Sequence, residues 1–200
     1  MKAGVLFSGG KDSSLAAILL SRDYEIELNT FVFDPGREVS GVMAAARALG
    51  FPWRKRVFEE GLLDEIMDQV ATCGYPNTAI TRLHRQAVLA LCSEYPVVAD
   101  GTRFNDRVPM LARDDVMRFF DAYGCSYVRP LLGFGKAEVE RLADRHLVVS
   151  RGQTGSIDNG DYEREIRLRM RAKGLDISRF FPDHHEQSLV VGRKLQSSGE

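Results

Sequence analysis

The residues with the clearest chemical potential lie near the amino end of the chain. An apolar stretch at residues 3–7 ends in Ser-Gly-Gly-Lys-Asp-Ser, and apolar residues then recur at helical spacing as far as residue 20. This pattern predicts a strand, a glycine turn and a helix. Amides of the first helical turn and the positive end of the helix dipole would then point at one spot, which favours an anion such as phosphate. The hexapeptide consists of Ser8, Gly9, Gly10, Lys11, Asp12 and Ser13.

A plainer interpretation of the same stretch stays open at this point. Turns between strands and helices are often rich in Gly and Ser because the turn needs them, and Asp12 or Ser8 would then only cap the helix. The common P-loop is excluded, because its Lys is followed by Ser or Thr whereas Lys11 is followed by Asp12.

A second polar segment follows a buried strand pattern at residues 97–99. It runs from Asp100 to Asp106 and contains the turn Gly101-Thr102. In a parallel sheet this segment lies at the ligand edge. The carboxylate of Asp106 suits a magnesium ion held against phosphate oxygens, because hard cations favour oxygen ligands. The alternative is an ordinary strand-end turn with solvated charges.

Alternating strand and helix patterns define the rest of the first 147 residues. Strands are expected near residues 3–7, 26–33, 53–57, 97–99 and 126–132, and helices near 12–20, 39–49, 60–70, 78–94, 107–123 and from 136. The fold class is therefore α/β, a three-layer parallel sheet with helices on both faces. Phe33 and Asp34 fall at the end of the second strand, while His84 on the fourth helix is expected at the surface or core edge rather than in catalysis.

The pattern changes after residue 147, which divides the chain into residues 1–147 and 148–200. Residues 152–161 are polar and glycine-rich, which indicates a mobile lid or a connection, and residues 162–173 form a basic helix. A short helical extension and a frayed tail at residues 192–200 are expected. The helix could contact an RNA backbone, or its charges could form a solvated face. The arginines concerned are Arg164, Arg167, Arg169 and Arg171.

Composition restricts the classes of protein. The chain has 200 residues, 44% of them hydrophobic, and a formal net charge of -1, which argues against a chain that is basic throughout for nucleic acid. Its three cysteines form no CxxC pair, so neither a disulfide framework nor a zinc or iron-sulfur site is indicated and a reducing cytoplasm fits. Neither a signal-peptide pattern nor an apolar run of about 18 residues is present, so no membrane association is expected.

The hexapeptide closely resembles the signature of the PP-loop ATPases, also called the N-type ATP pyrophosphatase or adenine nucleotide alpha hydrolase-like superfamily. The Gly-Thr turn with Asp106, and Pro130-Leu131 followed by Lys136, are similar to later motifs of that family, so the resemblance covers about residues 1–145. It implies bound ATP and Mg²⁺, with residues 8–13 and the Gly101-Thr102 turn on the nucleotide, Phe33 and Asp34 near adenine, and Asp106 on the metal. Lys11 and Lys136 would stabilise the pyrophosphate, and Asp12 would orient the loop or a metal-bound water.

The resemblance further implies a reaction in two steps. A substrate oxygen attacks the α-phosphate of ATP and pyrophosphate leaves; ammonia, an amine or sulfur then displaces AMP. The substrate would be a small acid, an amide or a tRNA. A tRNA-thiolating enzyme, which would need two catalytic cysteines such as Cys73 and Cys125, and a non-catalytic ATP or AMP sensor are the alternatives, and a homodimer is an expected assembly.

Overall fold

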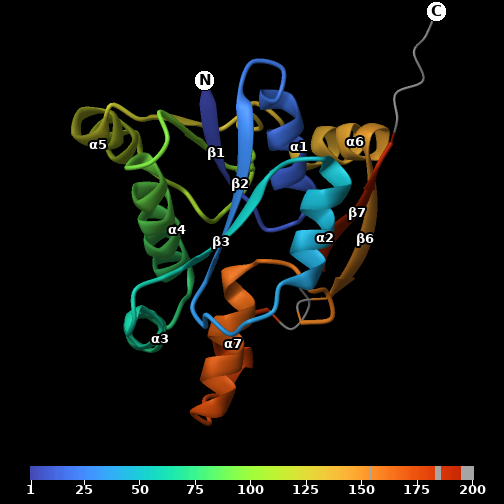
Figure 1. Cartoon of the computed structure of the whole chain (residues 1–200). Helices are drawn as coiled ribbons and strands as arrows, with labels where there is room; N and C mark the ends of the chain where they lie inside the picture. The colour runs from blue at the N-terminus through green and yellow to red at the C-terminus, as the bar shows by residue number, and fades with distance from the viewer. Residues whose placement is uncertain (154, 183–185, 195–200) are drawn as a thin grey trace, which may run out of the picture.

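A computed structural model of the chain describes residues 1–153, 155–182 and 186–194. At its centre lies a five-stranded sheet (Figure 1) in the order β3-β2-β1-β4-β5, and every neighbouring pair is parallel. The strands are β1 (Lys2–Leu6), β2 (Glu25–Val32), β3 (Trp53–Val57), β4 (Val97–Ala99) and β5 (Ser126–Val128). The predicted α/β class is confirmed. The order of the strands reverses between β1 and β4, where open parallel sheets bind their ligands.

Helices cover both faces of the sheet, as Figure 1 shows. Side chains alternate along each strand, so Val5 packs into one apolar cluster and Leu6 into the other. The first cluster holds residues of α1 (Lys11–Leu20), α2 (Ser40–Leu49) and α6 (Lys136–His146), and the second holds residues of α3 (Leu62–Cys73), α4 (Asn77–Cys92) and α5 (Arg113–Tyr123). The three-layer arrangement is therefore also confirmed.

One predicted helix begins later than expected. Helix α5 starts at Arg113 rather than at residue 107, and residues 107–112 form a loop. Pro109 lies in this loop. Proline has no amide hydrogen for a helix interior and disfavours the helical conformation of the residue before it, so the break has a local cause.

The carboxyl-terminal part contains more strand than expected. It comprises β6 (Leu147–Gln153), α7 (Tyr162–Ala172), the short helix η1 (Ile177–Arg179) and β7 (Glu186–Arg193), and β6 and β7 pair antiparallel. The basic helix is confirmed as a helix. The expected frayed tail is wrong for residues 192–193, which belong to β7, while residues 195–200 lie outside the described residues.

The β6–β7 hairpin packs on the main core. Leu147 and Val190 belong to the same buried cluster as Val5 of β1 and Val42 of α2. The division into residues 1–147 and 148–200 stays a prediction, because shared packing does not say whether the first part folds without the second.

Among the described helices, none has the length and apolar character needed to cross a bilayer.

Candidate functional site

A cleft of about 490 Å³ opens at the carboxyl ends of β1 and β4. Its volume lies within the range of small-molecule sites. The loops that leave these two strands line it, and so do residues 159–163 and 186–188 from the carboxyl-terminal part. The cleft therefore lies at the reversal point of the strand order, with one wall supplied by sequence far from both strands.

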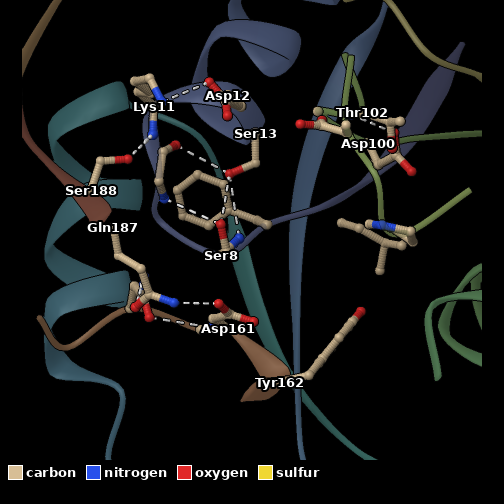
Figure 2. A pocket seen from close by; sticks show the side chains of 18 of the residues that line it. Ser8, Lys11, Asp12, Ser13, Asp100, Thr102, Asp161, Tyr162, Gln187 and Ser188 are labelled. Atoms are coloured by element: carbon tan, nitrogen blue, oxygen red, sulfur yellow. Dashed lines mark hydrogen bonds and ion pairs between the residues drawn. The ribbon is translucent and has the colours of Figure 1, made fainter. Parts of the chain in front are cut away.

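The loop of residues 8–13 forms one side of this cleft (Figure 2). Ser13 Oγ donates to Gly10 O at 3.2 Å and Gly10 N donates to Ser8 Oγ at 3.3 Å, so the turn is held by its own side chains. Gly9 adopts a positive φ of 78°, which glycine tolerates without strain. Gly10 is the N-cap of α1 and makes no side-chain cap, so the first amides of the helix depend on other partners.

The loop of residues 8–13 lies very close to Gly101, in the segment that follows β4. A Cβ atom on Gly101 would lie 2.6 Å from the carbonyl carbon of Asp12 and 2.6 Å from Ser13 N. Only glycine permits this approach, so Gly101 fixes the distance between the two cleft-lining loops. The sequence placed Gly101 and Thr102 at this edge, and Thr102 is buried in the cleft wall.

Lys11 is held between two carboxylates at the cleft. Its Nζ lies 3.3 Å from Asp12 Oδ1 and 3.3 Å from Glu140 Oε1. Glu140, on α6, also accepts hydrogen bonds from both terminal nitrogens of Arg151 on β6, at 2.9 and 2.8 Å. Sequence reasoning did not find Glu140 or Arg151, because neither belongs to a motif and both reach the loop only through tertiary packing.

Two buried polar atoms at the loop, Asp12 Oδ1 and Arg103 Nη1, make no hydrogen bond within the described part of the chain, and Asp12 Oδ1 has only its ion pair with Lys11 Nζ there. Burial raises the pKa of Asp12 above its ordinary value, although Lys11 and Arg103 oppose this shift. A buried donor without a partner, such as Arg103 Nη1, is costly unless a ligand satisfies it, and a weakly paired buried carboxylate oxygen can still accept a cation. The cleft therefore offers an oxygen ligand at Asp12 and a guanidinium donor at Arg103.

Asp106 lies at the cleft but is engaged by Arg103. Its Oδ2 accepts from Arg103 N at 2.8 Å, and its Oδ1 accepts from Arg103 Nε at 3.0 Å and Nη2 at 2.5 Å. Oδ1 therefore forms a salt bridge with the Arg103 guanidinium, and Oδ2 is held by the backbone amide of the same residue. Asp12 is paired more loosely, through Oδ1 with Lys11 Nζ at 3.3 Å and through Oδ2 with Arg103 Nε at 3.4 Å, and the expected role of Asp106 on a metal stays a prediction. No cluster of three or more His, Cys, Asp or Glu residues with metal-site geometry occurs among the described residues.

His84 belongs to a buried polar cluster that the sequence did not indicate. His84 Nε2 lies 2.5 Å from Asp100 Oδ2, the Tyr127 hydroxyl donates to the same oxygen, and Thr102 N donates to Asp100 Oδ1 at 2.9 Å. Burial works against the charge of Asp100, but His84, Tyr127 and the Thr102 amide keep its pKa below the ordinary value. An ionised carboxylate only accepts, so Nε2 carries the hydrogen. The cluster thus holds the Gly101-Thr102 turn in place.

The backbone amides of the two residues expected near adenine are hydrogen-bonded to helix α7, and their role at a nucleotide stays a prediction. Phe33 N and Asp34 N both donate to Glu165 Oε2, at 3.0 and 3.2 Å, and Glu165 also pairs with Arg37. Glu165 comes from α7 and accepts hydrogen bonds from the amides that follow β2. Neither Phe33 nor Asp34 is among the described residues that line the cleft, whereas Phe31 is.

The described part of the glycine-rich segment runs from β6 to α7 and packs against the loop. Gly160 N donates to Ser8 O at 2.7 Å, and Asn159 Nδ2 donates to Gln187 Oε1 at 3.0 Å. Asp161 caps α7 by accepting from Glu163 N at 3.1 Å. In Figure 2, Gln187 and Asp161 lie on the side of the view away from Asp100 and Thr102.

The remaining predicted residues divide between the cleft and the surface. Lys136, the first residue of α6, is exposed and lines the cleft. Cys73 is exposed at the end of α3 and Cys125 is buried, and neither is among the described cleft-lining residues. Cys125 lies instead against Cys92, which lowers the pKa of Cys125 and raises that of Cys92.

Most of the basic charge on α7 is neutralised locally. Arg164 pairs with Asp158 at 2.8 Å, Arg167 pairs with Glu163 at 2.5 Å, and Arg169 pairs with Asp64 at 3.1 Å. Arg171 is exposed. The helix therefore presents less positive charge than its sequence implies.

The profile of one protein family matches residues 1–192, and this family is described as "Family of unknown function (DUF7411)". The chain belongs to this family. The match includes the loop, the cleft and the β6–β7 hairpin alike. A relative from Methanocaldococcus jannaschii, named "Uncharacterized protein MJ0690", is 33% identical over 197 residues, which is 98% of each chain.

Two solved structures are also similar to this chain. One is the crystal structure of a predicted subunit of tRNA methyltransferase from Methanocaldococcus jannaschii, with 33% identity, a TM-score of 0.88 and coverage of 98% of both chains. This relative has the same fold along its whole length. The other is an NH3-dependent NAD synthetase from Campylobacter jejuni, with 16% identity, a TM-score of 0.48, and coverage of 72% of this chain and 63% of that one.

Proposed function

We propose that this protein is an ATP-dependent adenylating enzyme of the PP-loop type, which releases pyrophosphate. The observation that carries the proposal is the position of the loop of residues 8–13. The amino end of α1 and Lys11 face a cleft at the reversal point of a parallel sheet, where an anionic ligand is favoured. The resemblance of this loop to PP-loop signatures supports ATP as that ligand.

The proposed chemistry places negative charge on the leaving group. A substrate oxygen attacks the α-phosphorus, the bond to the bridging oxygen breaks, and pyrophosphate leaves with the electron pair. Lys11, the Arg103 donor without a partner and Lys136 all line the cleft and would stabilise that charge. The adenylated substrate would then lose AMP to an incoming nucleophile.

A divalent cation fits the same place. Asp12 Oδ1 is a buried oxygen whose contact with Lys11 Nζ, at 3.3 Å, is longer than the hydrogen bonds of 2.5 to 3.0 Å that engage both oxygens of Asp106 with Arg103, so Asp12 suits Mg²⁺ better. When bound there, Mg²⁺ would neutralise phosphate charge. Asp12 would hold the ion, and Lys11 would be released from Asp12 to contact phosphate.

The second nucleophile is proposed to be ammonia or an amine. Cys73 is exposed at the end of α3 and Cys125 is buried beside Cys92, and neither is among the described cleft residues. A thiol must reach the adenylated atom to transfer sulfur. Their positions do not support sulfur transfer through these two residues.

The test is pyrophosphate release from labelled ATP with magnesium, first with protein alone, then with pooled small metabolites, then with bulk tRNA. Release that depends on one pool supports the proposal and identifies the class of substrate. Lys11→Met should lower release by about 10²–10³-fold, since it removes one charged donor to the leaving group. Lys2→Met, at the opposite end of β1 and paired with Glu27, is the matched control and should leave release unchanged.

A role linked to tRNA is the second candidate function. The relative that has a TM-score of 0.88 and 98% coverage carries the name of a predicted subunit of tRNA methyltransferase. Release of pyrophosphate only in the presence of tRNA would favour it. ATP that is bound but never split, in every pool, would instead favour a sensor of ATP or AMP.

A further inference from the structure

We infer that the β6–β7 hairpin supplies two ligands, Arg151 and Ser188, for the pyrophosphate end of ATP. The inference rests on the proposed function, because it takes ATP as the occupant of the cleft. It assigns a binding role to a segment that lies outside the three motifs that resemble PP-loop enzymes.

The register of the hairpin brings the two side chains together. Arg151 on β6 is paired directly with Ser188 on β7, and both residues line the cleft. Residues directly opposite one another in an antiparallel pair have their side chains on the same face. The hairpin therefore presents a guanidinium and a hydroxyl side by side.

Three hydrogen bonds hold the loop of residues 8–13 against the carboxyl-terminal part of the chain, two of them with β7. Lys11 N donates to Ser188 Oγ at 3.1 Å, Val190 N donates to Gly9 O at 2.8 Å, and Gly160 N donates to Ser8 O at 2.7 Å. Figure 2 shows Ser188 beside Lys11 at the start of α1. The position of the hairpin relative to the loop is thus set by backbone as well as side-chain contacts.

Ser188 extends the donor set of the helix terminus. Its oxygen accepts from Lys11 N, which leaves the hydroxyl hydrogen available, and this hydrogen has no acceptor within the described residues. A hydroxyl can accept and donate at once, and accepting a hydrogen bond strengthens it as a donor. The amide of Lys11 therefore acts on an anion in the cleft through Ser188.

Arg151 is held ready by a shared carboxylate. Glu140 Oε2 accepts from both terminal nitrogens of Arg151, while Glu140 Oε1 lies 3.3 Å from Lys11 Nζ. One carboxylate thus keeps two cations beside the loop before a ligand enters. The planar fork of arginine matches the geometry of phosphate oxygens, and pyrophosphate carries enough charge to draw both cations from one carboxylate.

Isothermal titration of the full chain with Mg·ATP, Mg-pyrophosphate and AMP tests the inference. Arg151→Gln should weaken the binding of ATP and pyrophosphate by about ten- to hundredfold and leave AMP binding unchanged. Ser188→Ala should weaken ATP and pyrophosphate binding by about fivefold. Arg151→Lys keeps the charge without the fork and should be intermediate.

The controls come from the same elements. Arg141→Gln removes an exposed arginine of α6 that pairs with Glu138, and Ser150→Ala changes the residue next to Arg151 on β6. Neither residue is among the described cleft residues, and both variants should bind like wild type.

The failure of the inference differs from the failure of the proposed function. If the wild type binds neither ATP nor pyrophosphate, the proposed function falls. If the wild type binds both and Arg151→Gln binds them as Arg141→Gln does, the inference is overturned while the proposed function stands. The inference is also overturned if Arg151→Gln weakens the binding of AMP and of pyrophosphate equally. That result would indicate a general distortion of the cleft and not the loss of a ligand for one end of ATP.

Discussion

Gly101→Ala is the substitution whose effect follows most directly from the coordinates. The added methyl would lie 2.6 Å from the carbonyl carbon of Asp12 and 2.6 Å from Ser13 N, whereas ordinary contacts begin at 3.4 Å. The obstacle is backbone at the start of α1 and not the end of a flexible side chain. The loop and the β4 segment must therefore separate by about 0.8 Å.

That displacement has a cost in stability and in binding. Overpacking a well-packed site costs about 1–3 kcal/mol. With a urea m-value of about 2 kcal/mol/M, the midpoint of unfolding should fall by about 0.5–1.5 M. The loop amides, Lys11 and Asp12 move with the start of α1, and displacement of a binding group by about 1 Å costs about 100-fold in activity. The loss of ATP affinity should therefore be larger than the fraction of unfolded protein alone would produce.

Urea unfolding and ATP titration of the same preparation measure both effects. Gly133→Ala is the matched control: it adds the same methyl at the same edge of the sheet, where no atom lies within 4 Å and the backbone is not left-handed. It should change neither quantity. If Gly101→Ala and Gly133→Ala unfold at the same urea concentration and bind ATP equally, the close approach at Gly101 does not position the loop.

Three further changes test separate contacts. Tyr127→Phe removes one donor from the buried Asp100 and should lower the free energy of unfolding by about 1–3 kcal/mol, whereas Tyr123→Phe at an exposed position should not; equal midpoints would contradict the buried cluster. Hydrogen bonds from cationic side chains at α7 lower the pKa of Asp64 to about 2, so the unfolded state binds its proton first on acidification. The stabilisation from this pair is complete above about pH 4 and is lost as the pH falls to about 2; an NMR titration midpoint near 3.8 would show that the pair does not form. Asp158→Ala removes a carboxylate that accepts from the first turn of α2 at 2.9 Å and should cost about 1 kcal/mol in urea unfolding, and an unchanged midpoint would exclude this cap.

The first strand, its loop and α1 could be predicted from sequence because each signal is local. The apolar run, the two glycines and the helical spacing all lie within residues 3–20, and the structure places β1 and α1 there. The same is true of the Gly101-Thr102 turn. These residues come together at the cleft because parallel strands end at one edge, which is a property of the fold class.

The other wall of the cleft depends on partners distant in sequence. Ser188 contacts Lys11 across 177 residues, and Glu165 contacts Phe33 across 132. No spacing rule links such positions. Glu165 accepts hydrogen bonds from the amides of Phe33 and Asp34 after β2, a pairing that local sequence did not indicate, while their role near adenine stays a prediction. The buried contacts of His84 were not predictable for a similar reason, because its partners Asp100 and Tyr127 lie after β4 and on β5.

The charge of the cleft shows why its cations are paired in this structure. Seven acidic residues and four lysines or arginines occur among the described residues that line it: Asp12, Asp100, Asp106, Glu140, Asp161, Glu163 and Glu186, and Lys11, Arg103, Lys136 and Arg151. Free ATP would add further negative charge to this surplus. If a phosphate replaces Glu140 as the partner of Lys11 and Arg151, both cations remain paired. The Glu140 carboxylate then has no partner. Under the proposed function, the cleft therefore favours a nucleotide that arrives with its divalent cation, because the cation compensates the carboxylates that the phosphates displace.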